Sequence, residues 1–266
     1  MKIGIIGCGN MGSALLRGIL AKRLAPNQAI FCFDKDRNKL KGVRAQFSIT
    51  VCASISELVR KSEVIIVAVK PGDVALVLAD FTGSLEGKLI VSVCAGIPTR
   101  MYERVLGKVA VARVMPNLPA QIGQGISALS MGRFTGARQK KTALLLLSAV
   151  GEVVEVKEHL INAVTAISGS GPAFFFYLAE LMIATARQLG LDETTAKRLV
   201  LKTALGSALL LEQTTQRPQV LRQLVTSKEG TTEAAFKVLT KKKIQSIFTL
   251  AIKAAAKRAK GLEKTR

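Results

Sequence analysis

Six residues near the start of the chain have the types and spacing of a turn that binds a dinucleotide. They are Gly7, Cys8, Gly9, Asn10, Met11 and Gly12. Gly7 allows a tight turn, Gly9 lets a pyrophosphate approach the backbone, and Gly12 lets the following helix pack close to the preceding strand. Unpaired N–H groups at the start of that helix favour negative charge. The segment therefore predicts a site for NAD or NADP, whereas a bare turn is the simpler alternative.

Charged residues further along bear on which of the two cofactors the turn suits. Asp34 lies roughly 20 residues beyond the turn, where an acid binds the adenosine ribose hydroxyls of NAD. Lys35 and Arg37 are basic groups of the kind that hold the 2′-phosphate of NADP. A helix start with mixed charge explains the same residues without a ligand. These residues alone leave the choice of cofactor open.

A second candidate site is the hydroxyl-rich turn over residues 226–232. Such a turn caps the helix that follows it, and free N–H groups there can also hold a carboxylate. Proton donors are scarce, since the single histidine, His159, has no partner in the sequence pattern. Reduction of a ketone needs such a donor, whereas a protonated C=N bond accepts hydride with only a hydroxyl bonded to its nitrogen. The residues therefore favour imine reduction.

The first half of the chain alternates apolar strands with helical patterns. Strands are expected at residues 3–6, 30–33, 64–69, 89–93, 109–114, 126–130 and 153–156. Near-continuous apolar strands joined by helices predict an α/β fold with a doubly wound, mostly parallel sheet. Ligands bind past the carboxyl ends of such strands, which is where Lys70 and residues 94–96 fall.

The second half reads as helical throughout, so we expect two domains, residues 1–157 and residues 158–266. Two loops interrupt the helical half, at residues 168–172 and 226–232. The phenylalanines that follow Pro172 are expected to be core residues. The absence of a long linker predicts that the two halves pack directly together.

Composition excludes several classes of protein. The 266 residues are 49% hydrophobic, which is incompatible with a disordered chain. The net charge of +21 is spread along the chain without tryptophan or a nucleic-acid motif, so no nucleic-acid partner is expected. Neither a metal-ligand spacing nor a membrane span is apparent. Cys8 and the other three cysteines read as free thiols, and with no export signal the expected location is the cytoplasm.

Beyond these patterns, the chain resembles the pyrroline-5-carboxylate reductase family along nearly its whole length. The segments that carry the resemblance are residues 5–12, 68–71, 113–117, 163–173 and 225–232. The later blocks are specific, because other nicotinamide reductases share the first motif but not the serine-glycine and threonine segments in this order.

The resemblance implies a Rossmann domain followed by an all-α dimerisation domain, with a homodimer sometimes assembled into rings of dimers. It implies cofactor contacts from the glycine turn, the end of the second strand, and two further segments. These are Ala68, Val69, Lys70 and Pro71, and then Cys94, Ala95 and Gly96. It places the hydroxyl that bonds or protonates the ring nitrogen on Thr232. Further substrate contacts are Glu158, Ser227, Gly230 and Thr231. The family generally prefers NADPH, so NADP(H) is expected above NAD(H).

Three departures from the family pattern stand out. The usual Ser-Pro-Gly-Gly turn is Ser227-Lys228-Glu229-Gly230 here, which costs rigidity and conformational freedom. Ile55 replaces an asparagine that touches the adenosine, and Thr214 and Thr215 stand where a carboxylate is often found.

The resulting expectation is hydride transfer from NAD(P)H to 1-pyrroline-5-carboxylate, giving L-proline in the last step of its biosynthesis. Two alternatives remain: a related reductase of another cyclic imine or a hydroxy acid, and a catalytically silent nucleotide-binding homologue.

Overall fold

The structure of this chain is a computed structural model, which describes residues 1–264. The chain divides into two compact units, each described here by itself. The first is Met1–Ser170 together with the segment from Ala255 onward, and the second is Gly171–Ala254. This division follows packing alone, so the domain boundary expected between residues 157 and 158 stays a prediction.

The first unit is built on one eight-stranded sheet with the order β3-β2-β1-β4-β5-β6-β7-β8. Every neighbouring pair is parallel except β6 and β7, which are antiparallel. The strands are β1 Ile3–Ile6, β2 Ile30–Phe33, β3 Thr50–Val51, β4 Val64–Val67, β5 Leu89–Ser92, β6 Ala110–Met115, β7 Gly125–Met131 and β8 Gly151–Glu155. The mostly parallel sheet expected from the sequence is confirmed.

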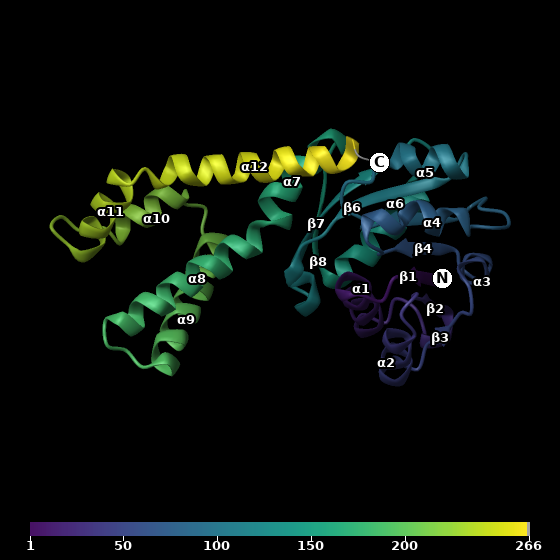
Figure 1. Ribbon diagram of the computed structural model, residues 1–266, viewed down its shortest axis with the longest axis horizontal. Coiled ribbons are helices and arrows are strands. Elements are labelled where there is room, and N and C mark those ends of the chain that lie inside the picture. Colours follow the sequence, from purple (N-terminus) through teal and green to yellow (C-terminus); the bar gives the residue numbers. More distant parts are fainter. Residues whose placement is uncertain (265–266) are drawn as a thin grey trace. The chain divides into compact units, whose positions relative to one another are not determined.

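Helices cover both faces of this sheet (Figure 1). Side chains of α1, α2 and α6 join one buried cluster, and those of α3, α4 and α5 join another on the opposite face. The helices are α1 Asn10–Ala21, α2 Arg37–Phe47, α3 Ile55–Lys61, α4 Val74–Ala79, α5 Thr99–Leu106, α6 Ala137–Leu147 and α7 Ile161–Val164.

Strands β1 and β4 have no polar side chain because both of their faces are buried. On β1, Ile5 belongs to the cluster under α1, and its neighbour Ile6 belongs to the cluster under α3. On β4, Ile66 and Ile65 divide in the same way. Successive strand residues point to opposite faces, so a strand covered on both sides reads as a continuous apolar run.

The second unit is helical, as expected. It contains α8 Gly171–Gln188, α9 Glu193–Gln213, α10 Pro218–Leu224, α11 Thr231–Lys241 and the first part of α12 Ile244–Lys264. The loop expected over residues 168–172 is wrong, because Thr165–Gly169 forms a π-helical turn and α8 begins at Gly171. The backbone N–H of Ser170 donates to the carbonyl of Thr165 at 2.8 Å. Pro172 fits the first turn of α8, where a missing N–H costs nothing.

Much apolar surface of the second unit is exposed in the single chain. Phe175 and Phe176 are 73% and 58% exposed, so the expectation that they are core residues is wrong for one copy. Phe174 contacts Phe248 edge to face at 6.1 Å. By length and composition alone, the helical stretch Glu158–Gln188 contains an 18-residue segment that is apolar enough to cross a membrane, with a mean hydropathy of 1.3. An apolar surface of this extent needs another apolar surface to cover it.

Candidate active site

The glycine turn lies between β1 and α1, and each of its glycines has a separate structural reason. Gly7 has a φ of +98°, and a Cβ there would lie 2.5 Å from the carbonyl oxygen of Ala68. A Cβ on Gly12 would overlap the carbonyl oxygen of Gly7. By contrast, apart from Gly9 and its two chain neighbours, no described atom lies within 4 Å of the position that a Cβ on Gly9 would take. Gly9 therefore leaves open space beside the backbone, as a pyrophosphate requires.

Helix α1 begins without a side chain that caps it. Its N-cap residue is Gly9, where no side-chain oxygen accepts a hydrogen bond from the first turn. The hydroxyl of Ser13 donates instead to the carbonyl oxygen of Cys8, at 2.9 Å. The backbone N–H groups at the start of α1 are thus available to an anion, and the helix dipole favours one there.

Asp34 follows β2 and holds the glycine turn in place. Its Oδ2 accepts from the backbone N–H of Cys8 at 2.7 Å, and its Oδ1 accepts from the N–H of Asp36 at 2.9 Å. Asp36 in turn caps α2 through the N–H groups of Asn38 and Lys39. The acid predicted to bind a ribose therefore has a structural task on each oxygen, although each oxygen can accept one further hydrogen bond.

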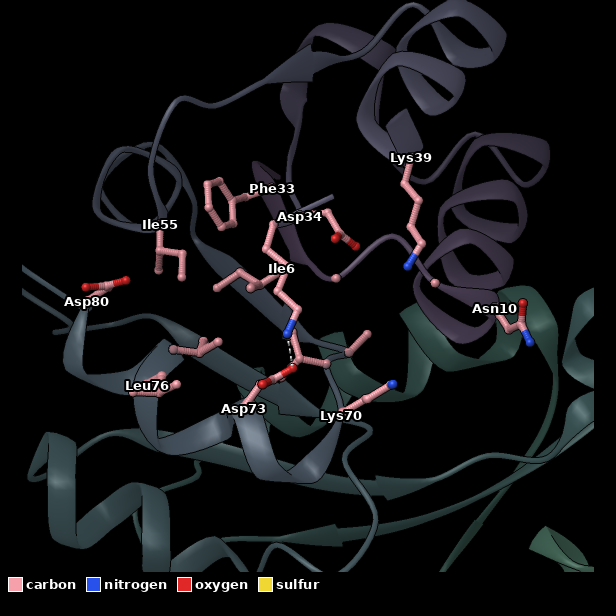
Figure 2. Close-up of a pocket in the computed structure, with 16 residues that line it drawn as sticks. Ile6, Asn10, Phe33, Asp34, Lys39, Ile55, Lys70, Asp73, Leu76 and Asp80 are labelled. Atoms are coloured by element: carbon pink, nitrogen blue, oxygen red, sulfur yellow. Dashed lines mark hydrogen bonds and ion pairs between the residues drawn. The ribbon is translucent and has the colours of Figure 1, made fainter. Parts of the chain in front are cut away.

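A cavity of about 540 Å³ lies beside this turn (Figure 2). It is lined by half of the predicted cofactor residues, namely Gly7, Gly9, Asn10, Asp34, Lys35, Ala68, Val69 and Lys70. Ile55, which replaces a family asparagine, also lines it. A cavity of this size and mixed lining suits a nucleotide-sized ligand.

Three charged residues of this cavity, Lys39, Asp73 and Asp80, were missed by the sequence analysis. Asp73 pairs with Lys35, whose Nζ lies 2.9 Å from its Oδ2. Lys39 projects into the cavity from the first turn of α2 (Figure 2). The sequence does contain a pattern that could have identified Lys39. It lies three residues after Asp36, the N-cap residue of α2, and this spacing places both residues on one side of that helix.

The other predicted cofactor residues do not line the cavity. They are Cys8, Met11, Gly12, Arg37, Pro71, Cys94, Ala95 and Gly96. Arg37 is the first residue of α2. Cys94 follows β5, and its thiol contacts the carbonyl oxygens of Val67 at 3.4 Å and Val69 at 3.3 Å. The segment after β5 is thus tied to the cavity wall through Val69.

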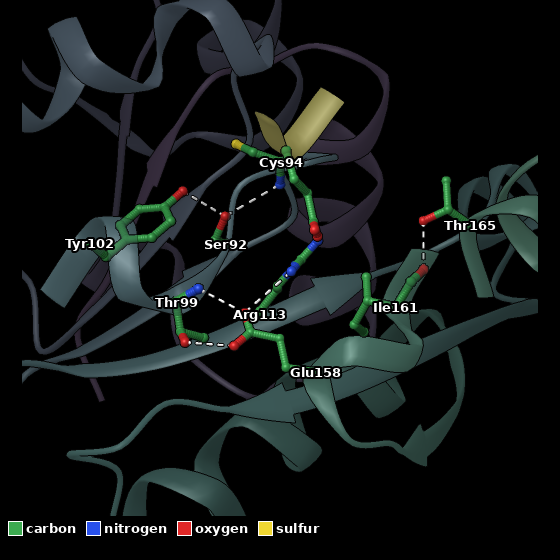
Figure 3. Close-up of polar contacts among 9 residues, drawn as sticks. Ser92, Cys94, Thr99, Tyr102, Arg113, Glu158, Ile161 and Thr165 are labelled. Carbon is green, nitrogen blue, oxygen red and sulfur yellow. Dashed lines mark hydrogen bonds and ion pairs between the residues drawn. The ribbon is translucent and has the colours of Figure 1, made fainter. Parts of the chain in front are cut away.

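Glu158 lies in a polar network at the carboxyl ends of β5 and β6 (Figure 3). Its Oε1 accepts from the backbone N–H of Thr99 at 2.8 Å, and its Oε2 accepts from the hydroxyl of Thr99 at 2.9 Å. Arg113 donates to the same Oε1 at 3.2 Å and to Glu263 at 2.6 Å. The sequence analysis did not single out Arg113, although an arginine inside an apolar strand must be paired when it is buried.

The threonine-rich turn belongs to the second unit and opens α11. Gly230 is the N-cap residue of that helix, and no side chain caps it, so the hydroxyl cap that the sequence suggested does not form. Thr231 and Thr232 occupy the first two helical positions. The turn is closed by the N–H of Gly230 donating to the carbonyl of Ser227 at 3.1 Å. The first N–H groups of α11 are accordingly available to a carboxylate.

The predicted departure at this turn has a structural consequence. Glu229 occupies the position where the family has glycine, and its φ is +59°. This left-handed conformation is unfavourable for a residue with a side chain. The carboxylate of Glu233 accepts from the N–H of Glu229 at 2.9 Å and pairs with Lys237 at 3.2 Å, and these contacts lower the pKa of Glu233, that with Lys237 most.

Among residues 1–264, no group of three or more His, Cys, Asp or Glu side chains is placed to hold a metal ion. The polar groups described above are hydroxyls, carboxylates, basic side chains and backbone N–H groups. They suit anion binding and hydrogen bonding.

In comparisons with known proteins, each half of the chain matches a described protein family. A family described as pyrroline-5-carboxylate reductase dimerisation matches residues 158–262. A second, described as NADP oxidoreductase coenzyme F420-dependent, matches residues 2–96.

Full-length relatives agree with these matches. A pyrroline-5-carboxylate reductase from Methanosarcina acetivorans is 37% identical, covering 99% of this chain and 98% of its own length. A solved structure of the reductase from Coxiella burnetii has a TM-score of 0.89 and 33% identity, with 98% of each chain covered. The Plasmodium falciparum pyrroline carboxylate reductase, solved with NADP bound, has a TM-score of 0.90 and 28% identity, covering 99% of this chain and 98% of that one. With its sheet, its glycine turn and its helical unit, the chain belongs to the pyrroline-5-carboxylate reductase family.

Proposed function

We propose that this chain transfers a hydride from NADPH to the C=N carbon of 1-pyrroline-5-carboxylate and so forms L-proline. The observation that carries the proposal is a pair of uncapped helix starts, at Gly9 and at Gly230. One suits the pyrophosphate of a dinucleotide and the other suits the carboxylate of a small substrate. The relatives of 33–37% identity, named as reductases of this substrate, support the reaction.

The dinucleotide binds, in this proposal, along the cavity beside β1 and β4, with its pyrophosphate on the turn from Gly7 to Gly12. Lys35 and Lys39 line this cavity and Arg37 is the first residue of α2, so basic side chains are at hand for a 2′-phosphate. Asp34 already accepts a hydrogen bond on each oxygen, so its main task is to hold the turn. NADPH is therefore proposed above NADH, in line with the NADP bound to the Plasmodium falciparum relative.

The substrate carboxylate binds to the N–H groups of the turn around Gly230 and Thr231, beside Ser227. The N–H of the protonated ring nitrogen donates a hydrogen bond to the hydroxyl oxygen of Thr232, and the nitrogen gains a lone pair, to which that hydroxyl can donate, as hydride arrives at the adjacent carbon. Because the reacting iminium carries a positive charge, addition of hydride leaves a neutral amine and no oxyanion to stabilise. A hydroxyl is a sufficient partner for that nitrogen. Glu158 is proposed to face the same substrate.

The working unit is proposed to be a homodimer in the cytoplasm. The match to a dimerisation family and the exposed apolar side chains of α8 and α9, such as Phe175 and Leu205, support self-association. A second copy provides the apolar cover that these helices need. Rings of dimers remain an expectation from the resemblance alone.

The test of this proposal is a set of single replacements in α11, with NADPH oxidation measured after addition of 1-pyrroline-5-carboxylate. Thr232→Ala is expected to lower kcat by at least about tenfold, a loss typical of one hydrogen bond to the reacting group, and Thr232→Ser is expected to retain most activity. Thr240→Ala, at the far end of α11, is the matched control. A Thr232→Ala enzyme within about twofold of the wild type would remove Thr232 from the mechanism.

A further inference from the structure

We infer that Glu263, near the end of α12, is a positioning residue for substrate binding and acts on Glu158 through Arg113. The inference rests on the proposed function, in which Glu158 faces the cyclic imine. Glu263 itself is not proposed to touch the substrate.

Arg113 is the centre of the arrangement. Its side chain is only 3% exposed, and it lies between two carboxylates. Nη2 is 2.6 Å from Oε1 of Glu263. Nη1 is 3.2 Å from Oε1 of Glu158 (Figure 3). A guanidinium taken out of water needs a close anionic partner, and the shorter bond gives Glu263 that task.

The balance of charge in this group follows from the two contacts. One guanidinium and two carboxylates leave the cluster with one net negative charge. Glu158 keeps its orientation through both of its bonds to Thr99, at 2.8 and 2.9 Å. With Arg113 already neutralised by Glu263, the charge of Glu158 is left to attract a cation. The protonated cyclic imine is such a cation, and so is the ring ammonium of L-proline.

A second contact brings the same turn of α12 to the other side of the predicted site. A Cβ on Gly96 would lie 2.9 Å from the Cβ of Leu262, and the φ of Gly96 is +73°. Leu262 therefore packs against the segment that follows β5, where a contact with the cofactor is expected. Adjacent residues of α12 thus contact the proposed cofactor segment and the arginine that pairs with the proposed substrate residue.

The test is Glu263→Gln, which keeps the shape of the side chain and removes its charge. The KM for 1-pyrroline-5-carboxylate is expected to rise by about 5- to 30-fold. Without the charge of Glu263, Arg113 is neutralised by Glu158 alone, and Glu158 then attracts the cationic substrate less strongly. The kcat and the KM for NADPH are expected to stay within twofold. Glu263→Asp is expected to restore most of the loss. Glu155→Gln removes a comparable but exposed ion pair, with Lys140 at 2.6 Å, and serves as the matched control.

A binding measurement separates this role from a merely structural one. Glu263→Gln is expected to weaken competitive inhibition by L-proline, which carries a ring ammonium. Inhibition by cyclopentanecarboxylate, which has the same ring size and carboxylate but no nitrogen, is expected to stay unchanged. Equal weakening of both inhibitors, or a fall in kcat and in both KM values, would assign Glu263 a structural role and overturn the inference.

The inference and the proposed function fail in different ways. A wild-type enzyme that does not oxidise NADPH in the presence of 1-pyrroline-5-carboxylate contradicts the function. An active wild type whose substrate KM rises in Glu158→Gln but not in Glu263→Gln contradicts only the role of Glu263.

Discussion

The backbone N–H of Cys8 donates a 2.7 Å hydrogen bond to the carboxylate of Asp34, so the end of β2 holds the turn that follows β1. The same carboxylate accepts from the N–H of Asp36, which caps α2. Asp34 thereby fixes the turn and the start of α2 relative to one another. An acid at this position can serve the dinucleotide site through the backbone as well as through a ribose hydroxyl.

Replacing Asp34 is expected to cost both stability and cofactor affinity. Asp34→Ala removes two hydrogen bonds to a charged acceptor, and the free energy of unfolding should fall by about 2–3 kcal/mol. Asp34→Asn keeps one acceptor oxygen and should lose less. Urea denaturation and NADPH titration by fluorescence measure the two effects. An Asp34→Ala protein of wild-type stability would show that the bond to Cys8 has no structural importance.

Two glycines of the same turn are expected to separate stability from binding. The new methyl group in Gly9→Ala meets no described atom within 4 Å beyond its two chain neighbours, so the melting temperature should match that of the wild type. NADPH binding should weaken at least tenfold, because the methyl group occupies the pyrophosphate space. Gly12→Ala overlaps the carbonyl oxygen of Gly7, so it should lower the melting temperature as well. Calorimetry and NADPH titration on both variants check this. Full NADPH affinity in Gly9→Ala would place the pyrophosphate elsewhere.

Glu229→Gly is expected to stabilise the protein by about 1 kcal/mol, since glycine adopts a φ near +59° without strain. Lys228→Gly is the matched control, because Lys228 does not have a positive φ and glycine there should destabilise. Thermal unfolding of both variants measures the change in stability that each replacement causes. Equal effects of the two replacements would mean that backbone strain at Glu229 is negligible.

Alkaline pH is expected to unfold the protein through groups that are buried in their neutral form. A hydrogen bond with Cys8, and then burial, raise the pKa of the Cys32 thiol above its ordinary 9.0, and burial raises the pKa of Tyr102 well above 10.0. Both pKa values are higher in the folded state. Stability from these groups is therefore complete below their unfolded pKa values and is lost as pH rises above them.

The expected loss is about 1.4 kcal/mol per pH unit for each such group. The free energy of unfolding, measured by urea denaturation at several values above pH 9.0, should fall more steeply in the wild type than in Cys32→Ala. Identical slopes in the two proteins would show that the Cys32 thiol ionises equally easily in the folded and unfolded chains.

The parts of the fold that local patterns determine could be predicted from the sequence. The parallel sheet follows from apolar runs such as β4 Val64–Val67, and the glycine turn follows from its spacing. Both depend on residues that are neighbours in the chain.

Features that depend on distant partners were missed. Arg113 and Glu263 lie far apart in sequence, and nothing local joins them. The task of Asp34 depends on an N–H group from the turn that follows another strand. The loop expected over residues 168–172 does not form, because a π-helical turn ends at Gly169 and α8 begins at Gly171, with Pro172 in its first turn. Phe175 and Phe176 look like core residues because periodicity does not distinguish burial within a chain from burial by a second copy.

Hydride transfer to the imine carbon is tested most directly with NADPH in which both hydrogens at C4 of the nicotinamide are replaced by deuterium. The purified protein, given this cofactor and 1-pyrroline-5-carboxylate, should form L-proline with one deuterium on the ring carbon that was double-bonded to nitrogen, and one cofactor should be oxidised per proline formed. Cofactor binding without oxidation, or proline without deuterium at that carbon, would contradict the account.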